Sequence, residues 1–141
     1  MKPNSEGSSK GISDLAIVDN EEQLYKVIAK NFELYGQPML LEEYIKGREF
    51  TVGILGNESD MEIFEPMEIS YLSKERVNTI YSYMVKKDYK KFVEYHCPPY
   101  LDTDTIEKMK DIAAKIYIAL DCKDFSRIDF RLSDDSTPLF Y

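Results

Sequence analysis

The sequence predicts an α+β fold, because helical and strand-like patterns both occur in a chain of one domain's length. Apolar residues recur at helical spacing in 21–35 and in 106–120, whereas alternation marks 49–54 and 127–130. The chain has 141 residues, which is enough for one hydrophobic core. Helices and strands of this kind within one short chain favour the α+β class.

Composition excludes several classes of protein. Apolar residues make up 43% of the chain and aromatic residues 13%, which is not the composition of a disordered polymer. The formal net charge of −8 argues against general nucleic-acid binding. No apolar run reaches membrane-spanning length and no signal-peptide pattern follows Met1, so we expect a cytoplasmic protein without a membrane partner. Cys97 and Cys122 are predicted to be free, buried thiols.

The first 13 residues are polar and rich in glycine and serine, and predict a loop after a very short strand. Backbone N–H groups can approach phosphate oxygens only where side chains are small. Ser8 and Ser9 add hydroxyl donors, and Lys2 adds a point charge. The loop matches neither the P-loop spacing nor GxGxxG, and a flexible polar N-terminus is the alternative interpretation.

The first helix is predicted over 21–35. Asp19 or Asn20 can cap it, and Gly36 followed by Pro38 ends it. Its apolar side is predicted to consist of Leu24, Val27, Ile28 and Leu34.

Two strand-like segments follow, 39–44 and 49–55. In the second, alternation predicts one face with Glu49 and Thr51 and an opposite face with Phe50, Val52 and Ile54. Adjacent Glu42 and Glu43 put at least one carboxylate on an otherwise apolar side, where an adenine amino group could be its donor. A solvated charge pair at a strand edge is the alternative. Glu49 would suit ribose hydroxyls, and its alternative is a salt bridge to Arg48 or to a neighbouring lysine.

The middle of the chain is predicted to hold a strand over 61–69, interrupted at Pro66, and then irregular structure over 70–100. Lys86 and Lys87 lie in this tyrosine-rich stretch, where either could reach phosphates or could belong to a solvated basic patch.

The strongest helical pattern begins at residues 102–105, with Thr103 and Glu107 offering a cap. Its apolar stripe is predicted to be core and consists of Ile106, Met109, Ile112, Ala113, Ile116, Tyr117 and Leu120. A strand over 126–132, a turn at 133–136 and a returning strand from Leu139 complete the chain.

Arg127 and Asp129 lie two residues apart and therefore share one strand face. Asp129 can ligate Mg²⁺, and Arg127 can neutralise a developing oxyanion. The alternative for the two residues is a surface ion pair.

These segments, in this order, resemble the ATP-grasp family of carboxylate–amine ligases, and within it the D-alanine–D-alanine ligases. The resemblance covers nearly the whole chain. It rests on Lys2-Pro3 with Glu6-Gly7-Ser8-Ser9, Glu42-Glu43-Tyr44-Ile45 with Gly47-Arg48-Glu49-Phe50-Thr51-Val52, Tyr83 with Lys86, Cys97-Pro98, and Arg127-Ile128-Asp129.

The resemblance implies an ATP-grasp fold, truncated at both ends, with a nucleotide held between a smaller lobe, 1–45, and a larger lobe, 46–141. It implies ATP with Mg²⁺ or Mn²⁺, small-molecule amino-acid substrates, an acyl-phosphate mechanism and a place in peptidoglycan precursor synthesis. It also allows a homodimer of the full-length protein.

The residues to which the resemblance gives roles fall into three groups. Those implied to bind nucleotide are Lys2, Glu6, Ser8, Ser9, Glu42, Glu43, Tyr44, Ile45, Glu49 and Lys86, with Lys87 the alternative to Lys86. Those implied to act in catalysis are Arg127 and Lys86. Asp129 is implied to hold the metal.

Departures from the family pattern define a second hypothesis. Met84 stands where the family usually has an acid, and Ser126 where it usually has glycine. The family pattern continues with a Glu and an Asn that complete the metal site, so we expect a fragment of a ligase, inactive by itself. The alternative function is a nucleotide-binding or regulatory module without catalysis.

Overall fold

The computed structural model describes residues 2–3, 17–57, 60–72, 83–133 and 137–140. By its internal contacts the chain divides into two compact units, Met1–Tyr44 with Tyr71–Val93, and Ile45–Ser70 with Glu94–Tyr141. The predicted lobes, 1–45 and 46–141, stay a prediction. The compact units differ from them by grouping Tyr71–Val93 with the beginning of the chain.

The first unit contains short strands and helices. Its elements are β1 (Lys2–Pro3), α1 (Glu21–Tyr35), β2 (Met39–Leu40), α2 (Tyr83–Lys87) and α3 (Tyr89–Phe92). Strands β1 and β2 pair antiparallel, with Lys2 opposite Leu40. The strand predicted over 39–44 is therefore confined to its first two residues.

Helix α1 begins and ends where the sequence predicts. The Asn20 side chain accepts a hydrogen bond from the Gln23 N–H at 2.9 Å, which satisfies one of the unpaired donors of the first turn. At the other end Gly36 takes the left-handed conformation, with φ of 58°, and donates its N–H to the Phe32 carbonyl.

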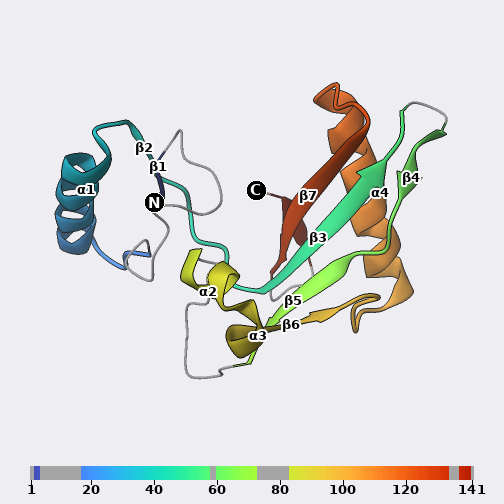
Figure 1. Ribbon diagram of the computed structural model, residues 1–141, viewed down its shortest axis with the longest axis horizontal. Helices are drawn as coiled ribbons and strands as arrows, with labels where there is room; N and C mark the ends of the chain where they lie inside the picture. The colour runs from blue at the N-terminus through green and yellow to red at the C-terminus, as the bar shows by residue number, and fades with distance from the viewer. Residues whose placement is uncertain (1, 4–16, 58–59, 73–82, 134–136, 141) are drawn as a thin grey trace. The chain divides into compact units, whose positions relative to one another are not determined.

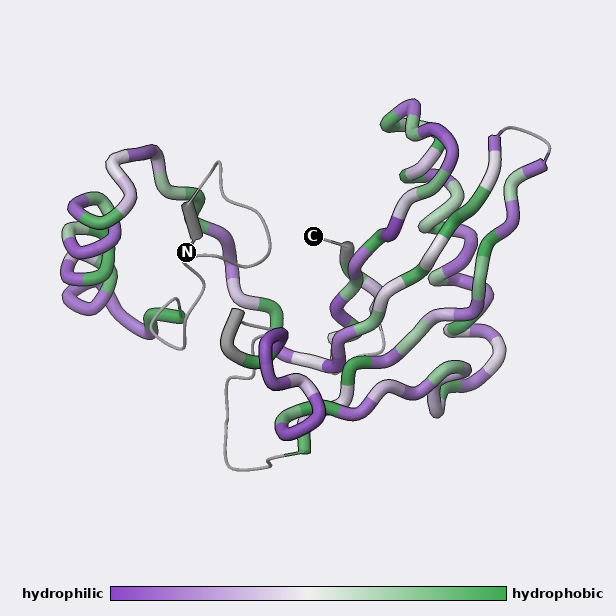
Figure 2. Tube along the Cα trace, viewed as in Figure 1, coloured by the Kyte–Doolittle hydropathy of each residue, from purple (hydrophilic) through white to green (hydrophobic). Residues whose placement is uncertain are grey.

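The prediction of the apolar side of α1 was wrong for one residue. Leu24, Val27 and Ile28 are half-buried, but Leu34 is 65% exposed. Tyr35, eleven residues and about three turns after Leu24, is half-buried instead. Figure 2 shows apolar and polar residues interleaved along α1.

The second unit is built on an antiparallel sheet. Its elements are β3 (Arg48–Leu55), β4 (Glu62–Ile63), β5 (Met67–Tyr71), β6 (Val93–His96), α4 (Thr103–Ala119), β7 (Phe125–Leu132) and β8 (Pro138–Phe140). The strand order is β6-β5-β3-β7-β8, and β4 also pairs with β3. Figure 1 shows α4 running along one face of this sheet.

The interruption predicted at Pro66 is confirmed. Ile54 pairs with Ile63 and Thr51 pairs with Met67, so the two residues between them on β3 oppose three residues, 64–66. This is the spacing of a β-bulge, where proline is tolerated because its missing N–H breaks no ladder bond.

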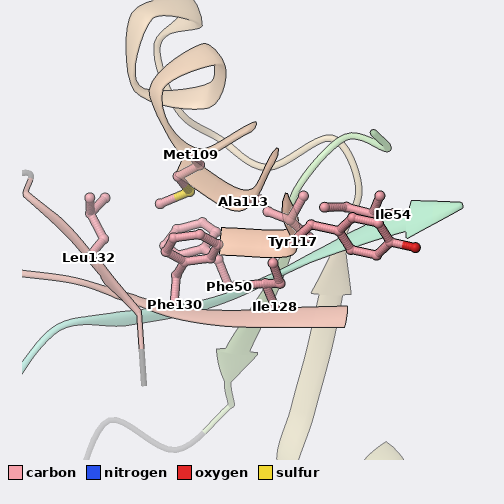
Figure 3. Close-up of a cluster of buried hydrophobic side chains, with 9 residues drawn as sticks. Phe50, Ile54, Met109, Ala113, Tyr117, Ile128, Phe130 and Leu132 are labelled. Atoms are coloured by element: carbon pink, nitrogen blue, oxygen red, sulfur yellow. The ribbon is translucent and has the colours of Figure 1, made fainter. Parts of the chain in front are cut away.

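The core of this unit lies between the sheet and α4. Nine buried side chains form it: Phe50, Val52, Ile54, Met109, Ala113, Tyr117, Ile128, Phe130 and Leu132. Phe50 and Phe130 are partners across β3 and β7, and Figure 3 shows their rings beside each other below Met109. Because alternate residues of both strands point at α4, the intervening residues of β3 and β7 must lie on the opposite face.

The helix predicted from residues 102–105 onward is confirmed as α4, but its predicted N-terminal cap was wrong. Asp102, and not Thr103, is the N-cap: its carboxylate accepts from the Thr105 N–H at 2.9 Å and from the Thr105 hydroxyl at 2.8 Å. These bonds hold the pKa of Asp102 below its ordinary value. Leu120, predicted to be core, is 69% exposed.

Among the described residues, no helix is long and apolar enough to cross a membrane.

Two further expectations were wrong. The stretch 70–100, predicted to be irregular, contains α2, α3 and β6. Cys97 and Cys122 are free thiols as predicted, but Cys97 is exposed and Cys122 is half-buried. The sheet explains the first difference, because β6 is stabilised by pairing beside β5 and not by a local pattern.

Candidate functional site

Polar and charged side chains gather on the face of β3 and β7 that points away from α4. The two strands are antiparallel partners with Glu49 opposite Arg131, Thr51 opposite Asp129, and Gly53 opposite Arg127. We call Glu49, Thr51, Arg127, Asp129 and Arg131 the charged face. Cross-strand neighbours on one face lie about 5 Å apart and diagonal neighbours about 7–8 Å apart, so these groups can act on one ligand.

Arg127 and Asp129 form a side-on ion pair. Arg127 donates from Nε to Oδ1 of Asp129 at 3.0 Å and from one terminal nitrogen to Oδ2 at 3.2 Å. The predicted alternative, a surface ion pair, is therefore present. It does not exclude a functional role, because a guanidinium has five N–H donors and each carboxylate oxygen has two lone pairs. The side chains are 62% and 36% exposed, which leaves both within reach of a ligand.

Glu49 forms a second ion pair, which is buried. A terminal nitrogen of Arg131 lies 2.6 Å from Oε1 of Glu49, and the two side chains are 7% and 3% exposed. Of the partners predicted in the alternative for Glu49, Arg48 is wrong, since it lies on the other face and pairs with Glu68 at 2.6 Å. Opposite charges that face each other across two paired strands attract, which explains why Glu49 pairs with Arg131.

Thr51 follows Glu49 on the same face of β3. Its hydroxyl is buried and has no hydrogen-bond partner among the described residues. Its cross-strand partner on β7 is Asp129. A buried hydroxyl without a partner is rare, so this one marks the charged face as a place where a polar ligand can bind.

Residues 42–45, which the resemblance implies bind nucleotide, form no regular secondary structure. Glu42 and Glu43 are exposed, which corrects the expectation of a buried acid and agrees with a solvated charge pair. Tyr44 and Ile45 are half-buried. The Ile45 carbonyl accepts a hydrogen bond from Arg131 at 3.2 Å, which joins the end of this segment to the charged face.

The predicted phosphate-binding residues lie in the first unit. Lys2 belongs to β1, and Lys86 and Lys87 belong to α2. Lys86 is half-buried and Lys87 is exposed. Three further predicted residues lie outside the described part of the chain: Glu6, Ser8 and Ser9.

Asp129 fits Mg²⁺ as one ligand of a larger set. Within the described residues, no three His, Cys, Asp or Glu side chains gather closely enough to hold a metal by themselves. Mg²⁺ commonly takes only one or two carboxylates and completes its shell with water and substrate phosphates. The half-open carboxylate of Asp129 is compatible with that mode.

Two residues of the charged face, Thr51 and Arg131, were missed from the sequence. Arg131 follows Asp129 at the same two-residue spacing that singled out Arg127, so alternation alone could have placed it on this face. Alternation puts Thr51 on the face of Glu49, but only the structure shows that its buried hydroxyl has no hydrogen-bond partner among the described residues.

The sheet and its covering helix match a solved D-alanyl-alanine synthetase, so this is part of an ATP-grasp fold. A family model described as "D-ala D-ala ligase C-terminus" matches residues 1–141. The chain therefore belongs to the family of the D-alanine–D-alanine ligase C-terminal domain.

Individual relatives agree with the family. The chain is 34% identical over 140 residues to a D-alanine–D-alanine ligase from Rickettsia bellii, covering 99% of this chain and 39% of the relative. It is 33% identical over 136 residues to one from Oceanobacillus iheyensis, covering 96% and 34%. The crystal structure of D-alanyl-alanine synthetase A from Vibrio cholerae is similar with a TM-score of 0.74 and 25% identity, over 99% of this chain and 40% of that one. The chain thus spans about two fifths of the length of such relatives.

Proposed function

We propose that the chain forms part of the nucleotide and metal site of an ATP-dependent carboxylate–amine ligase of the D-alanine–D-alanine type. The single observation that carries the proposal is the match of residues 1–141 to the ligase family. The charged face supports it, because Glu49, Arg127 and Asp129 extend from neighbouring positions of two paired strands.

The proposed reaction has two steps. The carboxylate of one amino acid attacks the γ-phosphorus of ATP, the bond to ADP breaks, and an acyl phosphate forms. The amine of a second amino acid then attacks the acyl carbon, an amide forms, and inorganic phosphate leaves with a proton lost from the amine. Mg²⁺, when bound, neutralises charge on the phosphate oxygens.

The residues of the charged face contribute different interactions to this reaction. Glu49 would accept hydrogen bonds from ribose hydroxyls, and Asp129 would hold the metal. Arg127 would direct the donors that Asp129 does not engage at the oxyanion of the tetrahedral intermediate. Asp129 orients Arg127 through two hydrogen bonds, so little reorganisation is needed when charge develops.

Other residues would bind the rest of the nucleotide. Lys2 and Lys86 would neutralise phosphates, with Lys87 the alternative to Lys86, and Lys86 would also act in phosphoryl transfer. Residues 42–45 would form the adenine hinge. The phosphate loop would contain Glu6, Ser8 and Ser9.

The proposal extends to cellular context. The reaction would build a peptidoglycan precursor from amino acids and ATP, which places it in the cytoplasm, where ATP is supplied. A homodimer of the full-length protein stays a prediction.

Two substitutions test the proposal. They are made in a protein that contains this chain and is as long as the relatives of the chain. We expect Arg127→Ala to lower kcat by ~100-fold or more with little change in ATP affinity, because an oxyanion donor acts mainly in the transition state. We expect Asp129→Asn to weaken Mg²⁺-dependent ATP binding as well as turnover. Phosphate release with D-alanine and calorimetry of ATP binding measure these two quantities.

The controls separate the alternatives. Melting temperature should change little in Arg127→Ala, because an ion pair this exposed contributes only about 0–1 kcal/mol. Equal turnover of Arg127→Ala and the unsubstituted protein would remove Arg127 from the mechanism. ATP binding without any turnover in the unsubstituted protein would support a regulatory module instead.

A further inference from the structure

Arg131 joins two segments that the proposed function assigns to the nucleotide. One terminal nitrogen donates to the Glu49 carboxylate at 2.6 Å, and the other donates to the Ile45 carbonyl at 3.2 Å and the Gly47 carbonyl at 3.5 Å. Glu49 is the proposed ribose ligand, and Ile45 ends the proposed adenine hinge. A single guanidinium therefore contacts both.

Stability alone does not account for this arrangement. A buried ion pair loses so much hydration that well-packed apolar residues often replace it without loss of stability. The strand pair β3–β7 already carries a large apolar core on its other face. A buried arginine here is better explained by what it holds in place than by the free energy of folding.

The geometry of the guanidinium suits this role. Its planar fork fixes the directions of its N–H donors, so a carboxylate and a carbonyl bound to it are fixed relative to each other. The segment it holds lies at a boundary of the compact units, because Ile45 is the first residue of the second unit. Gly47, with φ of 146°, also places its carbonyl beside Arg131.

We propose that Arg131 is a positioning residue for the adenosine part of the nucleotide. It orients the Glu49 carboxylate toward the ribose hydroxyls and fixes residues 45–47 relative to that carboxylate. This inference rests on the proposed function, and it adds a residue that contacts the binding groups and not the nucleotide itself.

The test compares two nucleotides that differ only in the ribose hydroxyls. Calorimetry measures the Kd of ATP and of 2′,3′-dideoxy-ATP, at one Mg²⁺ concentration, for a protein that carries this chain at the full length of its relatives. We expect the unsubstituted protein to prefer ATP by ~10-fold or more, because hydrogen bonds to a charged carboxylate are strong. Arg131→Met should reduce this preference to about twofold or less, because Glu49 then loses its orientation.

Three further variants make the result specific. Arg131→Lys keeps the buried positive charge but lacks the planar guanidinium, so it also serves if Arg131→Met does not fold. We expect Arg131→Lys to reduce the preference for ATP over 2′,3′-dideoxy-ATP severalfold. Glu49→Gln should abolish most of the preference, and adding Arg131→Met to it should lower the preference no further. Arg48→Met is the matched control, because Arg48 precedes Glu49 on β3 and forms a 2.6 Å ion pair with Glu68 on the other face of the sheet. It should leave the preference unchanged.

The outcomes are distinguishable. An unsubstituted protein that binds neither nucleotide contradicts the proposed function itself, before any variant is compared. If that protein prefers ATP and both Arg131 variants keep the same preference, the inference about Arg131 is wrong. It is also wrong if Arg131→Met weakens both nucleotides equally while the melting temperature falls, since that pattern indicates a structural role alone.

Discussion

Single residues on the charged face differ most in their exposure to solvent. The Arg127 and Asp129 side chains are 62% and 36% exposed, whereas Arg131 and Glu49 are 7% and 3% exposed. An exposed pair contributes about 0–1 kcal/mol, but removing one partner of a buried pair costs about 3–5 kcal/mol. A change in activity on substitution of Arg127 can therefore be interpreted directly. A change on substitution of Arg131 must be compared with the change in stability.

Thr51 allows a test of the unpaired hydroxyl. We expect Thr51→Val to leave the free energy of unfolding unchanged or to raise it, because the lost hydroxyl has no partner among the described residues. If a bound nucleotide or its metal-bound water uses that hydroxyl, the Kd of ATP with Mg²⁺ should rise by about 2–10-fold. Thr51→Ser, which keeps the hydroxyl, is the control. An unchanged Kd in Thr51→Val would mean that the hydroxyl has no ligand.

Among the four glycines that the structure describes, Gly47 is the one whose substitution should be most harmful. Its φ is 146°, and a Cβ there would overlap the carbonyl oxygen of Leu132 on β7. We expect Gly47→Ala to lower the free energy of unfolding by about 2–5 kcal/mol, from strain and overpacking together. Gly36→Ala is the comparison, because Gly36 also has a positive φ but no atom within 4 Å of the added Cβ, and should cost about 1–2 kcal/mol. Urea denaturation that gives equal losses would contradict the close approach.

Among the elements, α4 should respond to acid through its cap. The hydrogen bonds from Thr105 lower the pKa of Asp102 below the ordinary value of 3.8. A carboxyl whose folded pKa is depressed stabilises the fold above its unfolded pKa, and this stabilisation is lost as the pH falls through the folded pKa. The contribution should therefore be complete at pH 7 and should decline below about pH 3.8.

Two variants check this expectation by thermal melting between pH 7 and pH 3. Asp102→Ala should lower the melting temperature at pH 7, and the difference from the unsubstituted protein should shrink in acid. Asp102→Asn keeps an acceptor oxygen without a titrating group, so it should remain close to the unsubstituted protein at pH 7. A difference for Asp102→Ala that stays constant with pH would exclude the carboxylate as the source of the stabilisation.

For the whole molecule, we predict weak nucleotide binding by the isolated 141-residue chain. No group of three metal-ligating side chains exists among the described residues, so phosphate charge would be poorly neutralised. We expect a Kd for ATP of about 1 mM, with little dependence on Mg²⁺, and no ligase turnover. Calorimetry that shows tight, strictly Mg²⁺-dependent binding, or robust phosphate release with D-alanine, would contradict this prediction.

Local patterns in the sequence determined much of this protein. Helical spacing and capping residues placed α1 at residues 21–35, and alternation placed Phe50 and Val52 in the core with Glu49 on the other face. Alternation also placed Arg127 and Asp129 on one face of β7. These features were predictable because they depend on residues a few positions apart.

Only the tertiary structure decided which groups of the charged face meet. Glu49 and Arg131 are 82 residues apart in sequence, and their contact depends on the register of β3 against β7, which alternation does not fix. The same register leaves the Thr51 hydroxyl buried, with no hydrogen-bond partner in the described part of the chain, and brings the Leu132 carbonyl against Gly47. Local periodicity determines which face of a strand a side chain lies on. The cross-strand neighbours of that side chain depend on strand pairing between segments far apart in the sequence.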